Sequence, residues 1–107
     1  MKRGDVVIAT APGAYGKPRP YLVVQSDRFG EHASVTVLPF TSDLQNAPLF
    51  RITVDPAPST GLHAISQIAV DKVVTLPRKK LTEQVGSLDA DTMARVIRAL
   101  AVWLAIA

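Results

Sequence analysis

The sequence changes its hydrophobic period once, near residue 89, and that single change limits what the chain can fold into. Before it, short runs rich in β-branched residues alternate with clusters of Gly, Pro, Asp and Ser, which is typical of strands separated by turns. After it, apolar residues recur at helical spacing behind Asp89, a good N-cap residue; they are Met93, Val96, Ile97, Leu100 and Leu104. Short strands followed by one helix predict a mostly β fold, a small antiparallel barrel with a C-terminal α-helix.

The expected elements follow from these runs. We predict strands at about residues 5–10, 21–26, 34–40, 50–54 and 83–87, and a helix at about 89–106. Residues 64–76 form two consecutive strands or one bent strand, because Ser66-Gln67 and Asp71-Lys72 interrupt an apolar stretch. Pro39 indicates a sheet edge or a bulge near the end of its strand. Alternation at 50–54 predicts that Phe50, Ile52 and Val54 point inward and that Arg51 and Thr53 point outward.

Composition sets outer limits on the class of protein. A chain of 107 residues, 48% of them hydrophobic, is long enough for one domain with a single core. It contains no cysteine, which excludes disulfides and thiolate chemistry and fits the reducing cytoplasm, where we expect the protein. We expect no signal peptide and no membrane span, because no sufficiently long apolar run is present. A net charge of +3 mildly favours anionic partners such as RNA or an acidic protein.

Two cations lie in a stiff segment just before an apolar strand. In Lys17-Pro18-Arg19-Pro20, each basic residue precedes a proline, which favours extended backbone. Residues i and i+2 of an extended chain point to the same side, so Lys17 and Arg19 project together. This arrangement suits an anion; the alternative is a solvated loop with prolines as turn residues.

Five motifs occur in a fixed order along the chain. They are residues 3–7 (R-G-D-V-V), residues 16–27 with the Arg19-Pro20 pair, residues 38–42 (L-P-F-T-S), residues 71–75 (D-K-V-V-T), and residues 86–96 with G-S-L-D and M-A-R-V. Together they resemble the MazF/PemK toxin family of toxin–antitoxin systems over nearly the whole chain. The sequence departs from the family in two places. Lys72 and Val74 stand where many members carry the Gln and Arg of D-Q-I-R-T, and Gly13 and Ala14 stand in the loop before Arg19, where many members carry a Ser or His.

The resemblance implies a fold, an activity and partners. We expect an SH3-like barrel, a two-fold homodimer, metal-independent cleavage of single-stranded RNA without a cofactor, and neutralisation by an acidic antitoxin. The catalytic positions of the family correspond to Arg19 and Thr41, and Asp71 matches an acidic position where some members carry a proposed catalytic Asp. The candidate RNA-binding residues are Tyr15, Lys17, Ser42 and Lys72.

These residue types suit RNA cleavage through the 2′-OH. Arg19 can stabilise charge on the phosphate, Thr41 can donate a hydrogen bond to it, and Asp71 is the best available base. A purely structural role is the alternative for Thr41 and for Asp71. Thr41 could form a local turn hydrogen bond, and Asp71 could pair with Lys72 or with a loop N–H. His32 and His63 lie alone in loops, and no metal-ligand spacing occurs, so we expect no metal site.

Two other functions compete with the nuclease. One is a DNA gyrase poison of the CcdB type, which has a similar fold and acts through C-terminal residues; Val102-Trp103-Leu104-Ala105-Ile106 is a superficial likeness, and packing of Trp103 against the sheet is the simpler interpretation. The other is a barrel that binds RNA without cutting it.

The basic run Arg78-Lys79-Lys80 suits either a solvated face or a phosphate track.

Overall fold

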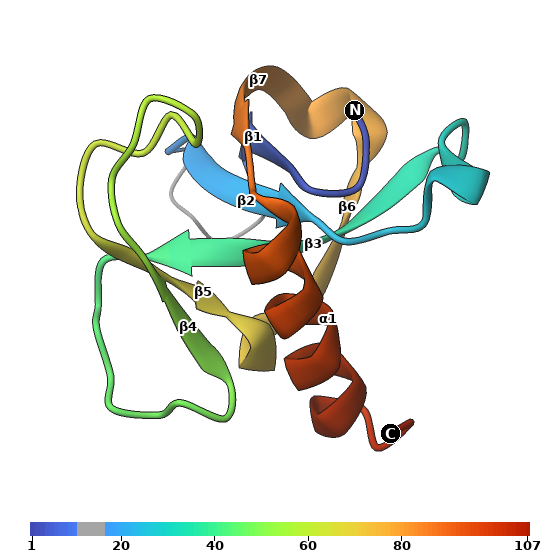
Figure 1. The fold of residues 1–107 in the computed structure, drawn as a ribbon. Coiled ribbons are helices and arrows are strands. Elements are labelled where there is room, and N and C mark those ends of the chain that lie inside the picture. The colour runs from blue at the N-terminus through green and yellow to red at the C-terminus, as the bar shows by residue number, and fades with distance from the viewer. Residues whose placement is uncertain (11–16) are drawn as a thin grey trace.

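The structure is a computed structural model that describes residues 1–10 and 17–107. Within them, one seven-stranded sheet has the order β4-β5-β3-β2-β1-β7, and β6 pairs with β3 off that path (Figure 1). Every strand pairing is antiparallel. The strands are β1 Asp5–Ala9, β2 Arg19–Val23, β3 Ser34–Thr41, β4 Arg51–Val54, β5 Ser66–Ala69, β6 Val74–Pro77 and β7 Leu81–Ser87; the helix α1 spans Ala90–Trp103, and short 3₁₀ turns span Asp27–Phe29 (η1), Val70–Lys72 (η2) and Arg78–Lys80 (η3).

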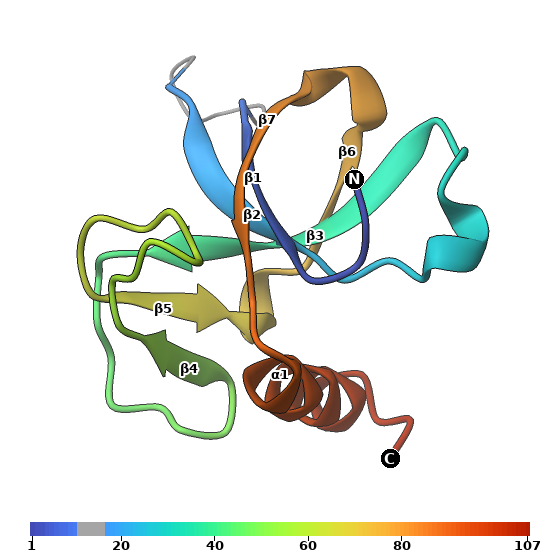
Figure 2. The ribbon, with the colours of Figure 1, turned by 45° about the horizontal axis from the view of Figure 1, so that its top comes forward.

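The long strand β3 gives the sheet its curvature. Its first half pairs with β6, its middle with β2, and its last two residues with β5. Because one strand serves three neighbours, the sheet bends back on itself into a small barrel (Figure 2). In the described part of the chain, no pairing joins β6 to β7, so the barrel is open along that seam. The expected fold class, a mostly antiparallel β structure with one C-terminal helix, is confirmed.

Apolar side chains fill both faces of the central strands, so the single expected core is divided in two. Neighbouring residues of a strand point to opposite faces. Leu22 and Leu38 therefore join the cluster beneath α1, whereas Val23 and Val37 join the cluster inside the barrel. Strands buried on both faces read as continuous apolar runs, which explains why β2 and β3 show little alternation in the sequence.

The helix α1 covers one face of the sheet. Asp89 caps it by accepting a hydrogen bond of 2.9 Å from the backbone N–H of Thr92, and hydrogen bonds from Thr92 hold the pKa of Asp89 below its ordinary value. Val96, in the middle of the helix, is fully buried against the sheet. The helix ends at Trp103 rather than near 106, because the chain reverses in a left-handed turn: the N–H of Ile106 bonds back to the carbonyl of Ala101, and Ala105 has a φ of 60°.

Two other details differ from the sequence expectations, and a third decides between two arrangements that the sequence left open. The strand β2 begins at Arg19, two residues early, because Arg19 pairs with Ala9 of β1. Pro39 is neither at an edge nor at a bulge; it lies opposite Tyr21 where β3 changes partner from β2 to β5, a position at which a residue without an N–H is tolerated. The stretch 64–76 is two strands, β5 and β6, separated by η2. No helix among the described residues has the length and apolarity to cross a membrane.

Candidate functional site

The sheet forks where β2 and β3 part, and the two main candidate residues lie on the two branches. The β2–β3 pairing stops at Tyr21 opposite Pro39. Beyond that pair, β2 continues along β1 with Arg19 opposite Ala9, whereas β3 continues along β5 with Thr41 opposite Gln67. Arg19 and Thr41 are each two residues from the last pair, so both point to the same face as Tyr21 and Pro39. This is the face opposite α1, because Leu22 and Leu38 occupy the helix side.

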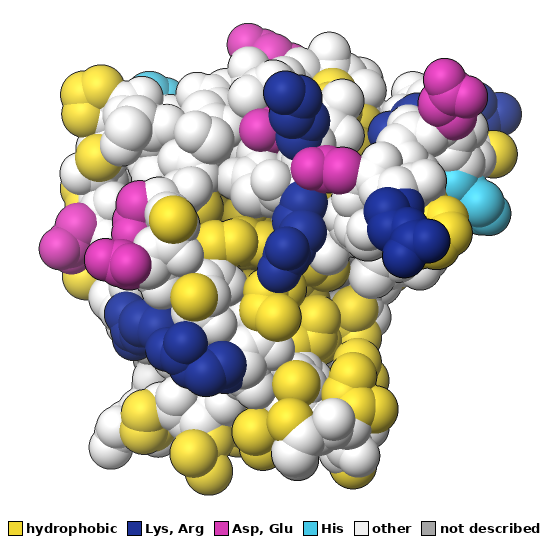
Figure 3. Space-filling model, turned by 45° about the vertical axis from the view of Figure 1, so that its right-hand side comes forward, with side chains coloured by type: hydrophobic (Ala, Val, Ile, Leu, Met, Phe, Trp, Pro, Cys, Tyr) yellow, Lys and Arg dark blue, Asp and Glu magenta, His cyan; other side chains and the backbone are white. Residues whose placement is uncertain are grey.

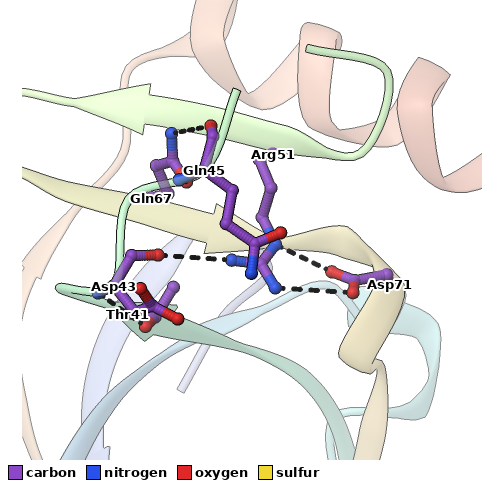
Figure 4. Close-up of polar contacts among 6 residues, drawn as sticks. All are labelled: Thr41, Asp43, Gln45, Arg51, Gln67 and Asp71. Carbon is purple, nitrogen blue, oxygen red and sulfur yellow. Dashed lines mark hydrogen bonds and ion pairs between the residues drawn. The ribbon is translucent and has the colours of Figure 1, made fainter. Parts of the chain in front are cut away.

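Thr41 is held by a turn of its own making. Its Oγ1 accepts a hydrogen bond of 3.0 Å from the backbone N–H of Asp43 (Figure 4). This is the local turn bond that the sequence left open as an alternative. A hydroxyl has one O–H donor besides its acceptor lone pairs, so the bond fixes the oxygen and leaves the donor for a ligand. The turn therefore orients Thr41 without using up the group that a phosphate needs.

Asp71 is paired with an arginine that the sequence placed on the outside. The Nε of Arg51 donates to Oδ1 of Asp71 at 3.0 Å, and a second guanidinium nitrogen lies 3.5 Å from Oδ2. The side chain of Arg51 is 3% exposed and that of Asp71 is 18% exposed. The prediction that Arg51 points to solvent is therefore wrong, because η2 covers this side of β4 and supplies the carboxylate. The partner of Asp71 is Arg51 rather than Lys72.

Gln67 fastens the loop after Thr41 to the sheet. Its Oε1 accepts the backbone N–H of Gln45 at 2.9 Å, and its Nε2 donates to the carbonyl of Gln45 at 2.9 Å; Figure 4 shows these two residues side by side. The same Nε2 also donates to Oγ1 of Thr53 at 3.3 Å. Gln67 is buried, with 6% of its surface exposed. The loop, the sheet and Arg95 of α1 line an open pocket of about 210 Å³, to which Arg51 and Gln67 contribute. The polar face beside Thr41 is thus held in place by hydrogen bonds between the loop and the sheet.

The remaining candidate residues lie on the surface around this face. Lys17 is exposed just before β2, Ser42 is exposed directly after Thr41, and Lys72 is exposed at the end of η2. Tyr15 lies outside the described residues. Arg19 itself is exposed at the first position of β2. The structure therefore brings Thr41, Ser42 and Asp71 to one branch of the fork, with Arg19 and Lys17 on the other.

Other polar features of the sequence belong to different parts of the molecule. His32 lies before β3, at the opposite end of that strand from Thr41, and its Nδ1 accepts the N–H of Ser34 at 3.1 Å. Arg78 donates to the carbonyl of His32 at 2.7 Å, so this member of the basic run ties η3 to the β2–β3 connection. His63 is exposed in the loop before β5. Within the described residues, no group of three or more His, Cys, Asp or Glu gathers.

Trp103 contacts the sheet side of the molecule, as its simpler interpretation required. Its ring lies 5.5 Å from that of Phe50, centroid to centroid, with the planes tilted by 50°. Phe50 directly precedes β4, so the contact ties the last turn of α1 to that strand. Trp103, which is 48% exposed, therefore has a packing contact, whereas its neighbours Val102, Leu104 and Ile106 remain exposed.

Sequence reasoning missed Arg51 and Gln67. Both looked ordinary: Arg51 occupied the polar phase of an alternating strand, and Gln67 looked like an interruption of an apolar stretch. One signal was present, because a long polar side chain inside an otherwise apolar strand requires a buried partner. The partner lies on another segment in each case, 20 residues away for Arg51 and 22 for Gln67.

Fold and site together define a class: a small, open antiparallel barrel that carries an exposed arginine and an oriented hydroxyl on one polar face. Comparison with known proteins identifies the family within that class. The family model described as "PemK-like, MazF-like toxin of type II toxin-antitoxin system" matches residues 2–104. The chain belongs to this family.

Individual relatives agree with the family match. The chain is 54% identical over 108 residues to a probable endoribonuclease MazF of Mycolicibacterium smegmatis, covering 100% of this chain and 99% of the relative. It is 32% identical to the endoribonuclease EndoA of Bacillus subtilis, covering 99% and 96%. Its fold matches a chain of a MazE-MazF crystal structure from Deinococcus radiodurans with a TM-score of 0.79 at 27% identity, covering 98% and 96%.

Proposed function

We propose that this protein is the toxin of a type II toxin–antitoxin system and cleaves single-stranded RNA, mRNA above all, without a metal ion or other cofactor. Family membership and relatives named as endoribonucleases support the activity. One observation carries the site: Arg19 and Thr41 face the same side from the two branches of the fork in the sheet. A strand of RNA that crosses the fork meets both.

The proposed reaction uses a nucleophile that the RNA itself supplies. The 2′-oxygen forms a bond to the adjacent phosphorus, its proton passes to a base, and the bond from phosphorus to the 5′-oxygen breaks. That oxygen takes up a proton and leaves as a 5′-OH end, and the other product ends in a 2′,3′-cyclic phosphate. The protein must align the three atoms, stabilise the extra charge on phosphorus, and serve the two proton transfers.

Arg19 and Thr41 fit two of these tasks. A guanidinium presents several donors in a planar fork that matches phosphate oxygens, and it remains charged at every physiological pH. Arg19 therefore suits charge stabilisation and cannot act as the base. The hydroxyl of Thr41, oriented by the N–H of Asp43, donates to a phosphate oxygen and fixes its position. Lys17, Ser42, Lys72 and Tyr15 are proposed to hold the flanking nucleotides.

Asp71 is the remaining candidate for the base. As a carboxylate near the loop that follows Thr41, it has the right chemistry to accept the 2′ proton. Its pairing with Arg51 favours a different role, which is developed in the next subsection.

A cleavage assay in chelator tests the proposal. Purified protein is incubated with a defined single-stranded RNA in EDTA, and the product ends are analysed. We expect cleavage to continue and to leave 5′-OH ends. Loss of activity in EDTA with recovery in Mg²⁺ would contradict the metal-independent mechanism, and 5′-phosphate ends would contradict attack by the 2′-OH.

The same assay separates the two competing functions. A gyrase poison leaves naked RNA intact, as does a barrel that binds RNA without cutting it. The family match already favours the nuclease over the poison, and the tilted contact between Trp103 and Phe50 gives the C-terminal aromatic residue a structural role.

We also propose that the antitoxin covers the face that carries Arg19. A surface arranged to hold a polyanion also holds an acidic, partly disordered peptide through the same cations. Such a peptide orders on binding and so covers a large area at moderate affinity. A non-cleavable substrate RNA and the antitoxin should exclude one another, and Arg19→Ala should weaken both. Simultaneous binding of both to one protomer, measured by calorimetry, would place inhibition elsewhere.

A second copy of this chain is the proposed occupant of the apolar surface around the end of α1. Figure 3 shows hydrophobic side chains gathered between the helix and the β2–β3 connection. A groove there is lined by Val24, Phe29 and Leu100, among others, and Phe29 is 56% exposed. Val102, Leu104 and Ile106 add exposed apolar surface at the C-terminus. Sedimentation at micromolar concentration should give a homodimer; a monomer there would contradict this proposal.

Because the proposed substrate of the protein is mRNA, we place the protein in the cytoplasm.

A further inference from the structure

Arg51 is a charged side chain in a place that water hardly reaches. It lies on β4, faces the same side of the sheet as Thr53 and Thr41, and has a side chain that is 3% exposed. A buried guanidinium requires a negative partner, because removal of that partner leaves an uncompensated charge in a medium of low polarity. Among the described residues, Asp71 is the one carboxylate that forms an ion pair with it.

This dependence bears on what Asp71 can do in catalysis. A general base is neutralised each time it takes a proton. If Asp71 took the 2′ proton, the buried guanidinium of Arg51 would lose its counter-charge at the moment of reaction. Both carboxylate oxygens face the guanidinium, at 3.0 and 3.5 Å, so neither is free of it. The geometry thus favours a carboxylate that stays ionised throughout the reaction.

The same guanidinium reaches the turn that orients Thr41. Its Nη1 lies 3.5 Å from the carbonyl oxygen of Asp43, a long contact that the charge strengthens. The N–H of Asp43 in turn donates to Oγ1 of Thr41 at 3.0 Å. Figure 4 shows the guanidinium between the carboxylate of Asp71 and the backbone of Asp43, with Thr41 directly beyond. A continuous set of contacts therefore runs from η2 through β4 to the hydroxyl at the end of β3.

We propose that Arg51 and Asp71 are positioning residues for the cleavage reaction: the carboxylate orients the guanidinium, the guanidinium holds the backbone of Asp43, and that backbone fixes the hydroxyl of Thr41. The proposal rests on the proposed function, since it concerns the same site. It assigns Asp71 an indirect role and leaves the proton from the 2′-OH to another group or to water.

Two substitutions test the pair while keeping its shape. Asp71→Asn retains an acceptor for the Nε of Arg51 but removes the charge, and Arg51→Lys retains the charge but removes the fork. Matched controls are Asp55→Asn and Arg28→Lys, because both residues are exposed and neither side chain forms a hydrogen bond or ion pair among the described residues. Circular dichroism confirms folding, and if one variant of the pair does not fold, the other still tests the proposal.

The first readout is kinetic. Misplacement of a reacting or stabilising group by about 1 Å costs on the order of 100-fold in rate. We expect each variant of the pair to lower kcat by about 10- to 100-fold with KM nearly unchanged. In Asp71→Asn, the pH profile of kcat/KM should keep its wild-type shape. If Asp71→Asn removes the acidic limb of that profile while Arg51→Lys cleaves at the wild-type rate, Asp71 is the base and the proposal is overturned.

The second readout is a double-mutant cycle with Thr41→Val. If Asp71 acts through Thr41, then Asp71→Asn in a Thr41→Val background should cost no more than about twofold, because the set of contacts already lacks its end. An undiminished loss in that background would show that Asp71 acts independently of Thr41, and would overturn the proposal.

The third readout does not depend on cleavage. Hydrogen exchange of the Asp43 amide, followed by NMR, should be faster in both variants and unchanged in the two controls. Unchanged exchange in both variants would overturn the positioning role. If the wild-type protein fails to cut RNA at all, the proposed function fails, and this exchange measurement still decides whether the pair holds the turn.

Discussion

Gln67→Met is the substitution whose cost the structure predicts most directly. Methionine has nearly the same volume and reach as glutamine, so packing is preserved and the three hydrogen bonds of the amide are lost. A hydrogen bond contributes about 0.5–1.5 kcal/mol net, which sets an upper limit of about 4.5 kcal/mol for three. Gln45 is exposed, so its backbone groups regain water after the substitution. We therefore expect a loss of about 2 kcal/mol in the free energy of unfolding.

Urea unfolding at one protein concentration measures this loss in the free energy of unfolding. Thermal unfolding gives a second measure: for a domain of about 100 residues, a loss of about 2 kcal/mol corresponds to a fall of about 8–16 °C in the thermal midpoint. The control is Gln84→Met, because Gln84 is exposed on β7 and, within residues 1–10 and 17–107, its amide makes one hydrogen bond, a long one of 3.5 Å. Should Gln67→Met lose no more stability than Gln84→Met, Gln67 does not fasten the loop and the description of this face is wrong.

Three further predictions concern separate parts of the molecule. Arg19→Ala should lower the cleavage rate by about 100- to 1,000-fold without changing the unfolding midpoint, and Arg19→Lys should keep only part of the wild-type rate. If Arg19→Ala cleaves at the wild-type rate, Arg19 is not part of the site. Asp89→Ala should destabilise α1, measured by urea unfolding at several pH values. Because the folded-state pKa of Asp89 is lowered, the part of its contribution that depends on its charge is complete above the ordinary aspartate range near pH 4 and is lost as pH falls through the lowered value. The difference between the variant and wild type should therefore shrink in acid, and a difference that does not change with pH would contradict a role for the charge. Gly86→Ala should cost about 1–3 kcal/mol, because the new Cβ would lie 2.4 Å from the carbonyl carbon of Thr60, whereas Gly30→Ala, with its nearest atom at 3.2 Å, should cost much less in the same unfolding measurement.

Much of the fold could be predicted from local patterns. The change from β-branched runs to helical spacing near residue 89 predicts strands followed by one helix, and Asp89 predicts where that helix starts. The prolines around Arg19 predict extended backbone, and Arg19 lies at the first position of β2. These features depend on a residue and its near neighbours, which is why a single sequence suffices to read them.

For the candidate site too, local patterns identify residues but not their arrangement in space. The sequence indicated Arg19 and Thr41 as candidates through their motifs, but not that they lie on two branches of one fork. That arrangement arises because β3 leaves β2 after Pro39 and joins β5, a choice between partners distant in sequence. No local pattern distinguishes one antiparallel partner from another, since each presents the same backbone donors and acceptors.

By itself, the sequence determined the element types, the start of the helix and the residues capable of the chemistry. Only the tertiary structure decided that Arg51 is buried, that Asp71 is its partner, and that Gln67 holds the loop beside Thr41. The physical reason is that alternation in β4 shows only which residues share a face of the strand. Whether that face is buried depends on η2 and on the loop at residues 42–48, which are remote from β4 or irregular in structure. A polar side chain reads as exposed until a remote segment both buries it and satisfies its hydrogen bonds.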